Sequence, residues 1–163
     1  METLFNQSRR LLRMTSLNYV RPIIQQVHWN QRLVSIRGAR GVGKTTLLLQ
    51  YIKQTYGDNP KEAIYVSLDN LYFSRHSFLD FVDDFYKMGG KHIFADEVHK
   101  YHGWSQELKN AYDAYPDMRF VITGSSILNI LNSDADLSRR CINYNMQGLS
   151  FREYLRLCEG ISF

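Results

Sequence analysis

The segment with the clearest chemical potential in this chain is a glycine-rich stretch that ends in lysine and threonine. It fits the pattern G-x-x-x-x-G-K-[ST] and reads Gly38-Ala39-Arg40-Gly41-Val42-Gly43-Lys44-Thr45. Glycines permit positive φ angles and a close backbone approach, so successive amide groups can point at the oxygens of a polyphosphate. Lys44 would reach the β- and γ-phosphates, and the hydroxyl of Thr45 would bind Mg²⁺. The alternative is an ordinary glycine-rich turn.

The sequence on either side of this stretch favours the phosphate site. An apolar run at 33–36 precedes the loop and a helix-like run at 46–52 follows it, which is the order of elements that the motif requires. The amino terminus of that helix would then face the same anion. We therefore assign nucleotide binding to nine positions: Gly38, Ala39, Arg40, Gly41, Val42, Gly43, Lys44, Thr45 and Thr46.

Hydrolysis of a bound nucleotide also needs a group that positions Mg²⁺ and a group that activates water. An apolar run at 93–95 ends in two adjacent carboxylates, Asp96 and Glu97. Asp96 would hold the metal, directly or through water, and Glu97 would polarise the attacking water. A strand that runs into a solvated acidic turn would leave the same pattern, so this alternative stays open.

A third apolar run, at 120–122, ends in small hydroxyl residues. Ligands of open parallel sheets bind at the carboxyl ends of the strands. Thr123 or Ser125 is therefore expected to hydrogen-bond the γ-phosphate or the attacking water. The alternative is that a serine here caps the next helix, and the two roles are compatible.

Strand-length and helix-like runs alternate along the chain. Strands are expected at 33–36, 63–68, 92–95, 119–123 and 142–146, and helices at 45–56, 77–88, 105–115, 125–132 and 150–158. This alternation predicts an α/β fold with a mostly parallel sheet that carries helices on both faces. The first 30 residues predict one or two amphipathic helices packed before the sheet.

Composition predicts one globular domain. The 163 residues are 44% hydrophobic and 22% charged, which is enough apolar surface for a core. The net charge of +4 comes from scattered residues, so it does not by itself indicate nucleic-acid binding. Two cysteines without metal-ligand spacing favour a reducing cytoplasm, and the sequence shows no run of membrane-spanning length. We expect a soluble cytoplasmic protein without a membrane partner.

Taken together, the ordered motifs resemble those of the prokaryotic AAA+ superfamily of P-loop ATPases, in the group whose members carry a C-terminal domain of unknown function. The matching segments are 38–49 (GARGVGKTTLLL), 65–69 (YVSLD), 93–100 (IFADEVHK), Trp104, 121–126 (VITGSS) and 149–155 (LSFREYL). The resemblance implies a three-layer P-loop core with the five strands in the order 5-1-4-3-2. It also implies ATP and Mg²⁺ as ligands and assembly into homo-oligomers.

This chain departs from the family pattern in two ways. Family members often carry a Gly-Arg pair before the last core strand, whereas this chain has Arg139 and Arg140. The resemblance makes Arg140 a candidate for stabilising transition-state charge, in its own site or in a neighbour's; a surface ion pair is the alternative. The chain also ends soon after the last motif. We expect a helical segment at 1–30 and a P-loop ATPase core at 31–163, without the lid and the C-terminal domain.

Two classes of function remain open. The first is a Mg²⁺-dependent ATPase core with slow turnover, and the second is a nucleotide-gated module that recruits protein or DNA with negligible turnover. A metabolite phosphotransferase ranks below both, because no arginine-rich lid is evident. GTP is disfavoured because the chain lacks an N-K-x-D motif. His99 and His102 are interpreted as polar loop residues, with a metal site as the minor alternative.

Overall fold

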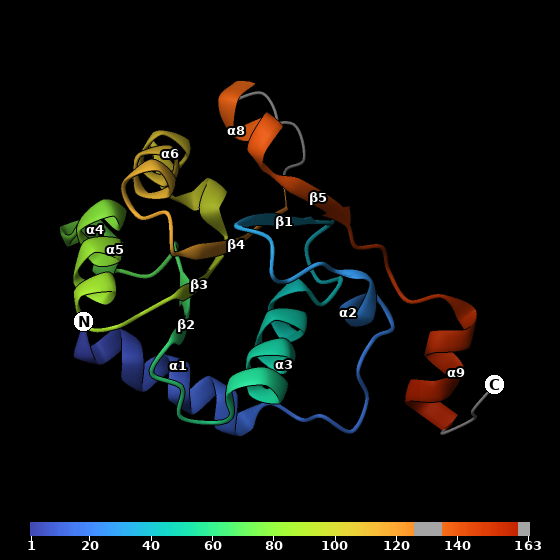
Figure 1. Cartoon of the computed structure of the whole chain (residues 1–163). Coiled ribbons are helices and arrows are strands. Elements are labelled where there is room, and N and C mark those ends of the chain that lie inside the picture. Colours follow the sequence, from blue (N-terminus) through green and yellow to red (C-terminus); the bar gives the residue numbers. More distant parts are fainter. Residues whose placement is uncertain (126–134, 160–163) are drawn as a thin grey trace.

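The computed structural model describes residues 1–125 and 135–159, and its central element is a five-stranded parallel sheet (Figure 1). The strands are β1 (Leu33–Arg37), β2 (Ala63–Ser67), β3 (His92–Asp96), β4 (Arg119–Gly124) and β5 (Ile142–Asn145). Their order is β2-β3-β4-β1-β5, which is the predicted order read from the opposite edge. The α/β fold and the strand order are therefore confirmed.

The strands bring the sequence motifs to one edge of the sheet. Every residue of β1 and of β3 is buried, as expected for strands covered on both faces. Because all paired strands are parallel, their carboxyl ends lie at a common edge. The glycine-rich loop after β1, the acid pair at the end of β3 and the hydroxyl residues at the end of β4 therefore lie at that edge.

Helices cover both faces and complete the three layers (Figure 1). On one face lie α3 (Lys44–Tyr56) and α2 (Ile23–Gln26), which pack against a core that includes Val34, Ile36 and Phe94. On the other face lie α4 (Tyr72–Arg75), α5 (Phe78–Lys87) and α6 (Trp104–Ala114), around a second core rich in phenylalanine. Burial of these two apolar surfaces fixes the sheet between the helices.

Helix α1 (Glu2–Met14) covers the exposed edge of strand β2. Leu4 contributes to one core and Leu12 to the other, so the helix bridges the two faces of the sheet. The buried hydroxyl of Ser8 accepts a hydrogen bond from the backbone N–H of Tyr65 in β2, at 3.1 Å. An uncovered edge would present unpaired backbone groups, and α1 prevents this.

The remaining described elements are the 3₁₀ turn η1 (Val98–Lys100), α8 (Ala135–Arg140) and α9 (Phe151–Glu159). Helices expected near 45–56, 77–88, 105–115 and 150–158 are present. Ser77 and Ser150 each accept a backbone N–H in the first turn of the helix that follows. The helix expected at 125–132 falls outside the described residues from 126 onward. The short helices α4 and α8 were not predicted.

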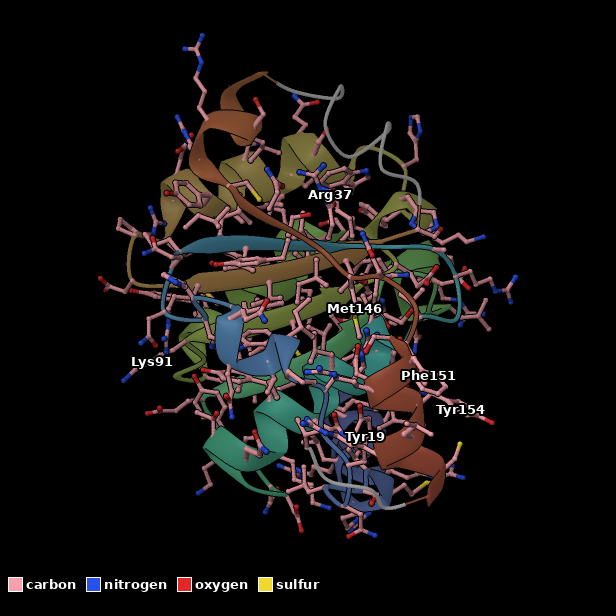
Figure 2. All side chains as sticks on the ribbon, turned by 90° about the vertical axis from the view of Figure 1, so that its right-hand side faces the viewer. Tyr19, Arg37, Lys91, Met146, Phe151 and Tyr154 are labelled. Carbon is pink, nitrogen blue, oxygen red and sulfur yellow. The ribbon has the colours of Figure 1, made fainter. Side chains whose placement is uncertain are left out.

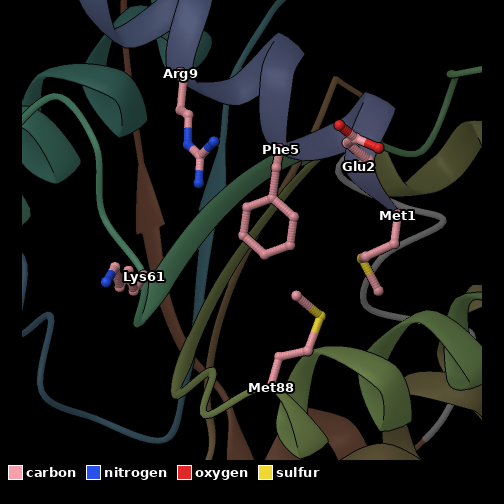
Figure 3. A pocket seen from close by; sticks show the side chains of 6 residues that line it. All are labelled: Met1, Glu2, Phe5, Arg9, Lys61 and Met88. Atoms are coloured by element: carbon pink, nitrogen blue, oxygen red, sulfur yellow. The ribbon is translucent and has the colours of Figure 1, made fainter.

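A hollow of about 440 Å³ lies near the amino-terminal end of strand β2, away from the motifs. It is lined by Met1, Glu2, Phe5, Arg9, Lys61 and Met88 (Figure 3). Lys61 precedes β2, and Met88 follows α5, the helix before β3, so the hollow adjoins the starts of the strands rather than their ends. Within the described ranges, no helix is both long enough and apolar enough to cross a membrane.

Candidate nucleotide-binding site

The glycine-rich loop adopts a backbone that needs glycine at particular positions. Gly43, which precedes α3, has a φ of 102°, and Gly41 has a φ of 86°, both in the left-handed region. Gly38 needs its small size instead, because a Cβ atom there would lie 2.4 Å from the carbonyl oxygen of Met146. The start of the loop therefore packs directly against the main chain that follows β5.

Lys44 begins helix α3, and its side chain folds back over the loop. Its buried ammonium donates hydrogen bonds to the carbonyl oxygens of Gly38 and Ala39, each at 2.8 Å. Burial lowers the pKa of Lys44, while the charges of Glu97 and Asp96 act in the opposite direction. The ammonium thus lies in the loop with both predicted acids close enough to influence its pKa.

Asp96 is buried and accepts three side-chain hydrogen bonds. The Thr45 and Tyr65 hydroxyls donate to Oδ2, the latter at 2.6 Å, and the Thr123 hydroxyl donates to Oδ1. Thr45 and Asp96, the two predicted metal ligands, are therefore in direct contact. Burial and the nearby Asp96 raise the pKa of Tyr65 far above its usual value, so its hydroxyl remains a donor.

Glu97 has a backbone conformation that few residues other than glycine adopt. Its φ of 58° and ψ of 41° lie in the left-handed region, and it is the one non-glycine residue with positive φ in the described ranges. Its N–H donates to the Thr123 hydroxyl at 3.2 Å. Thr123 therefore braces both acids, a role that the sequence did not suggest. This left-handed backbone ends β3 and directs the chain into η1.

His99 lies between Glu97 and Ser125. Its Nε2 atom is 3.4 Å from Oε2 of Glu97 and 3.2 Å from Oγ of Ser125. Interpreting His99 as a plain loop residue missed these contacts, whereas His102 is exposed. The available signal was the position of His99 one short turn after the acid pair.

Two predicted arginines lie away from this cluster. Arg40 is exposed on the loop. Arg140 ends α8, just before the amino end of β5, and pairs with Asp113 while its guanidinium lies 5.4 Å from the ring centre of Tyr112. Since the glycine-rich loop adjoins the carboxyl ends of the strands, the structure does not bring Arg140 to the loop of its own chain.

A hollow of about 270 Å³ adjoins the loop on the side of α9. Its lining includes Tyr19, Arg21, Gly43, Thr46, Met146 and Leu157. Arg21 donates to the carbonyl of Val42 at 3.0 Å and forms an ion pair with Glu153 at 2.6 Å. The Tyr19 hydroxyl is buried without a partner among the described residues, and burial raises its pKa, with Glu153 contributing in the same direction.

The residues present fit a nucleotide with Mg²⁺. Mg²⁺ prefers oxygen ligands, and Thr45 and Asp96 offer a hydroxyl and a carboxylate in contact with each other. Lys44 supplies a buried ammonium at the helix start, where backbone amides also favour anions. Fold and site together define an AAA+-type P-loop nucleotide-binding core.

The chain belongs to the family described as AAA domain, whose model matches residues 30–155. It is 32% identical over 139 residues to the uncharacterized protein MJ1637 of Methanocaldococcus jannaschii, covering 80% of this chain and 29% of that protein. This chain therefore spans less than a third of the length of that relative.

Two solved structures of low sequence identity match this chain, and one of them shares its fold. The replication initiator DnaA, bound to AMPPCP and single-stranded DNA, matches with a TM-score of 0.51 and 18% identity, over 76% of this chain and 42% of that one. PCH-2 of C. elegans matches with a TM-score of 0.49 and 17% identity, over 88% of this chain and 41% of that one. At this identity the DnaA match supports the fold alone.

Proposed function

We propose that this chain is the nucleotide-binding core of a Mg²⁺-dependent ATPase. The observation that carries the proposal is the contact between Thr45 and Asp96 beside a glycine-rich loop into which the Lys44 ammonium folds. Asp96 accepts the Thr45 hydroxyl, and Lys44 lies within the electrostatic range of both Asp96 and Glu97. Membership of the AAA domain family and the DnaA-like fold support the same proposal.

The loop residues would bind the triphosphate. Lys44 now donates to two loop carbonyls, and phosphate oxygens are stronger acceptors for the same ammonium hydrogens. The amides of residues 38–46 and the start of α3 would surround the remaining oxygens. Bound Mg²⁺, held by Thr45 and Asp96, would neutralise charge on the phosphates.

Glu97 would act on the attacking water. Its side chain is 31% exposed, whereas Asp96 is almost completely buried, so Glu97 is the acid that water can reach. Ser125 lies at the same edge and is the better candidate for contact with the γ-phosphate, because the Thr123 hydroxyl already donates to the Asp96 carboxylate and accepts the backbone N–H of Glu97.

The base would lie in the hollow beside α9. Whole-ligand pockets measure about 300–1,000 Å³, so a hollow of about 270 Å³ suits a base whose phosphates extend along the adjoining loop. The Tyr19 hydroxyl, which has no partner among the described residues, offers a hydrogen bond there. Since no guanine-reading N-K-x-D motif is present in the chain, we assign adenine.

A nucleotide titration with Mg²⁺ tests the binding site. Lys44→Ala should weaken ATP binding at least about 10-fold, since charged hydrogen bonds contribute about 1.5–3 kcal/mol. Lys61→Ala, which removes an exposed lysine at the start of β2, is the matched control and should bind like the parent. Equal affinity of the Lys44→Ala variant and the parent would contradict the assignment of the loop.

Glu97→Gln tests catalysis separately from binding. The amide keeps the shape of the side chain but is a much poorer base, so ATP binding should persist while turnover falls about 100-fold or more. A Glu97→Gln variant that hydrolyses ATP at the parental rate would show that another group activates water.

A second candidate function is a nucleotide-gated interaction module. Helix α9 beside the base hollow exposes 74% of Phe151 and 51% of Tyr154 (Figure 2). Large apolar side chains exposed together often mark a contact surface. A protein or DNA client, or a second copy that receives Arg140, would fit this reading. In a single-turnover assay, bound ATP that stays intact for hours would favour the module over the enzyme.

We further propose that the protein acts in the cytoplasm. The two cysteines are not bonded to each other, and a reducing compartment keeps thiols in this state.

A further inference from the structure

The Glu97 carboxylate needs a restraint beyond its own backbone. The backbone N–H of Glu97 is held by Thr123, but three side-chain torsions separate the backbone from the carboxylate. A base that orients water must be held within about 0.5 Å of its working position. Among the described residues, the polar side chain in contact with this carboxylate is His99, whose Nε2 lies 3.4 Å from Oε2.

The burial of His99 decides which ring nitrogen carries the proton. Nδ1 is buried and has no hydrogen-bond partner among the described residues. A buried N–H without an acceptor costs about 1–3 kcal/mol. A proton on Nε2 instead has the Ser125 Oγ, its hydrogen-bond partner at 3.2 Å, and the Glu97 Oε2, at 3.4 Å from the same nitrogen, as acceptors that can share it. The Nε2–H tautomer is therefore favoured.

In this tautomer His99 links the acid to the end of the neighbouring strand. Nε2 is 3.2 Å from Oγ of Ser125, which directly follows β4, and 3.4 Å from Glu97, which directly follows β3. The imidazole side chain is 15% exposed, so its surroundings limit its motion. His99 thus ties Glu97 to the segment that we expect to meet the γ-phosphate.

We propose that His99 is a positioning residue for ATP hydrolysis, which holds the Glu97 carboxylate beside Ser125 by sharing its single Nε2–H between the two. This inference rests on the proposed ATPase function. His99 touches neither the nucleotide nor the metal in this proposal and acts only through Glu97. Its loss should therefore lower kcat and leave nucleotide affinity unchanged.

Three substitutions at position 99 separate positioning from packing. His99→Ala and His99→Leu both remove the donor, and leucine restores most of the volume. His99→Gln retains an N–H donor of similar reach. We expect kcat to fall between about 10-fold and 100-fold in the alanine and leucine variants, with parental ATP affinity, and to stay within about 3-fold in the glutamine variant. If His99→Leu keeps as much of the parental kcat as His99→Gln does, His99 acts by packing and the proposal is wrong.

A double-mutant test asks whether His99 acts through Glu97. In a Glu97→Gln background, adding His99→Ala should cause no further loss of kcat, because the group that His99 positions is already inactive. A further loss of 10-fold or more would show that His99 acts by another route.

Ring ¹⁵N–¹H spectra of the ligand-free protein test the contact without any turnover. We expect the Nε2–H tautomer at His99 and a shift of its signals in Glu97→Ala, while the buried His92 stays unchanged as the internal reference. A proton on Nδ1, or His99 chemical shifts that are the same in Glu97→Ala and in the parent, would show that His99 does not contact Glu97 in solution.

The two proposals fail in distinguishable ways. Parental turnover in His99→Ala, with Lys44→Ala inactive, overturns the role of His99 and leaves the ATPase function standing. If the wild-type protein binds ATP without hydrolysing it, both the proposed ATPase activity and the role of His99 in hydrolysis are wrong. The spectra still decide whether His99 holds Glu97.

Discussion

Hydroxyl groups, rather than a cationic side chain, hold the buried acid of this site. Asp96 accepts from Thr45, Tyr65 and Thr123, and these come from the loop helix and from both strands that flank β3. A buried carboxylate is stabilised when hydrogen-bond donors surround it. Neutral donors leave its charge available for a metal ion, whereas a direct bond from Lys44 would have neutralised it.

Gly38 shows how little space a single residue of the loop has. In Gly38→Ala the new Cβ would lie 2.4 Å from the Met146 carbonyl oxygen, which belongs to the main chain and cannot move alone. We expect a loss of about 1–3 kcal/mol in the free energy of unfolding, together with weaker ATP binding. Chemical denaturation and nucleotide titration measure the two effects.

Gly148→Ala is the matched control, because nothing lies within 4 Å of a Cβ at that position. It should match the parent in both measurements. If Gly38→Ala unfolds and binds ATP as the parent does, the close approach of the Met146 carbonyl is not a constraint in solution.

At the scale of elements, two helices stabilise the surroundings of the site: α1, which packs along strand β2, and α9, which is bonded near the glycine-rich loop. Helix α1 covers β2, the strand that carries Tyr65, and Lys53 of α3 donates to the carbonyls of Leu12 and Thr15 at the end of α1. Bonds to terminal carbonyls satisfy acceptors that a helix leaves open. Helix α1 therefore fixes the strand from which Tyr65 reaches the Asp96 cluster.

Ser8→Ala tests the contact between α1 and the edge strand. The substitution leaves the buried N–H of Tyr65 without its acceptor, which should cost about 1–3 kcal/mol of unfolding free energy. Ser16→Ala is the control, since the Ser16 hydroxyl bonds an exposed N–H and should contribute less than about 0.5 kcal/mol. Equal stability of the two variants would mean that water replaces the Ser8 hydroxyl.

Helix α9 is held near the loop by the pair of Arg21 and Glu153. Burial raises the pKa of Glu153, but hydrogen bonds from Arg21 and Ser150 outweigh it and lower the net value. The Glu153 carboxylate therefore stays charged at lower pH than an ordinary glutamate does. The contribution of the pair is complete above the usual pKa of glutamate and is lost as pH falls through the lowered pKa.

Glu153→Gln should release α9 from the loop at neutral pH. Charged hydrogen bonds contribute about 1.5–3 kcal/mol, so amide exchange in α9 should accelerate about 10-fold or more while exchange in β3 is unchanged. Glu62→Gln, from the exposed pair with Lys91, is the control and should leave α9 unaffected. Unchanged exchange in Glu153→Gln would mean that apolar contacts alone hold the helix.

At the scale of the whole molecule, local patterns predicted the sheet but not the contacts between strands. Alternating apolar and helix-like runs gave all five strands, and the resemblance gave their order. Tyr65 could not be assigned, because it belongs to an apolar strand and meets Asp96 only after β2 and β3 pair. The contact of His99 with Ser125 and the place of Tyr19 beside the loop also join segments that no local period connects. Helix α8 spans only six residues, too few for a periodic apolar pattern.

The stability of the whole molecule should depend on pH through His92. This residue is buried at the start of β3, where burial, and then Arg119, lower its pKa to about 3. An unfolded chain binds the proton near pH 6.5, at the usual pKa of histidine. Between these values the unfolded state carries a proton that the native state lacks. The free energy of unfolding therefore decreases as the pH is lowered, by up to about 1.4 kcal/mol per pH unit. Above about pH 6.5 neither state is protonated, and the effect vanishes.

His92→Gln should therefore flatten the stability profile between about pH 6 and pH 4. Urea denaturation at each pH gives the free energy of unfolding, and titrating carboxylates cancel in the difference between variant and parent. His102→Gln is the control, because His102 is exposed and should keep the parental slope. The Tyr56 hydroxyl is 2.9 Å from Nδ1 of His92. In His92→Gln, the side-chain amide oxygen can take the place of this nitrogen as its partner. Parallel profiles for His92→Gln and the parent would mean that His92 takes up its proton in the native state, and hence that β3 opens at its start before the molecule unfolds.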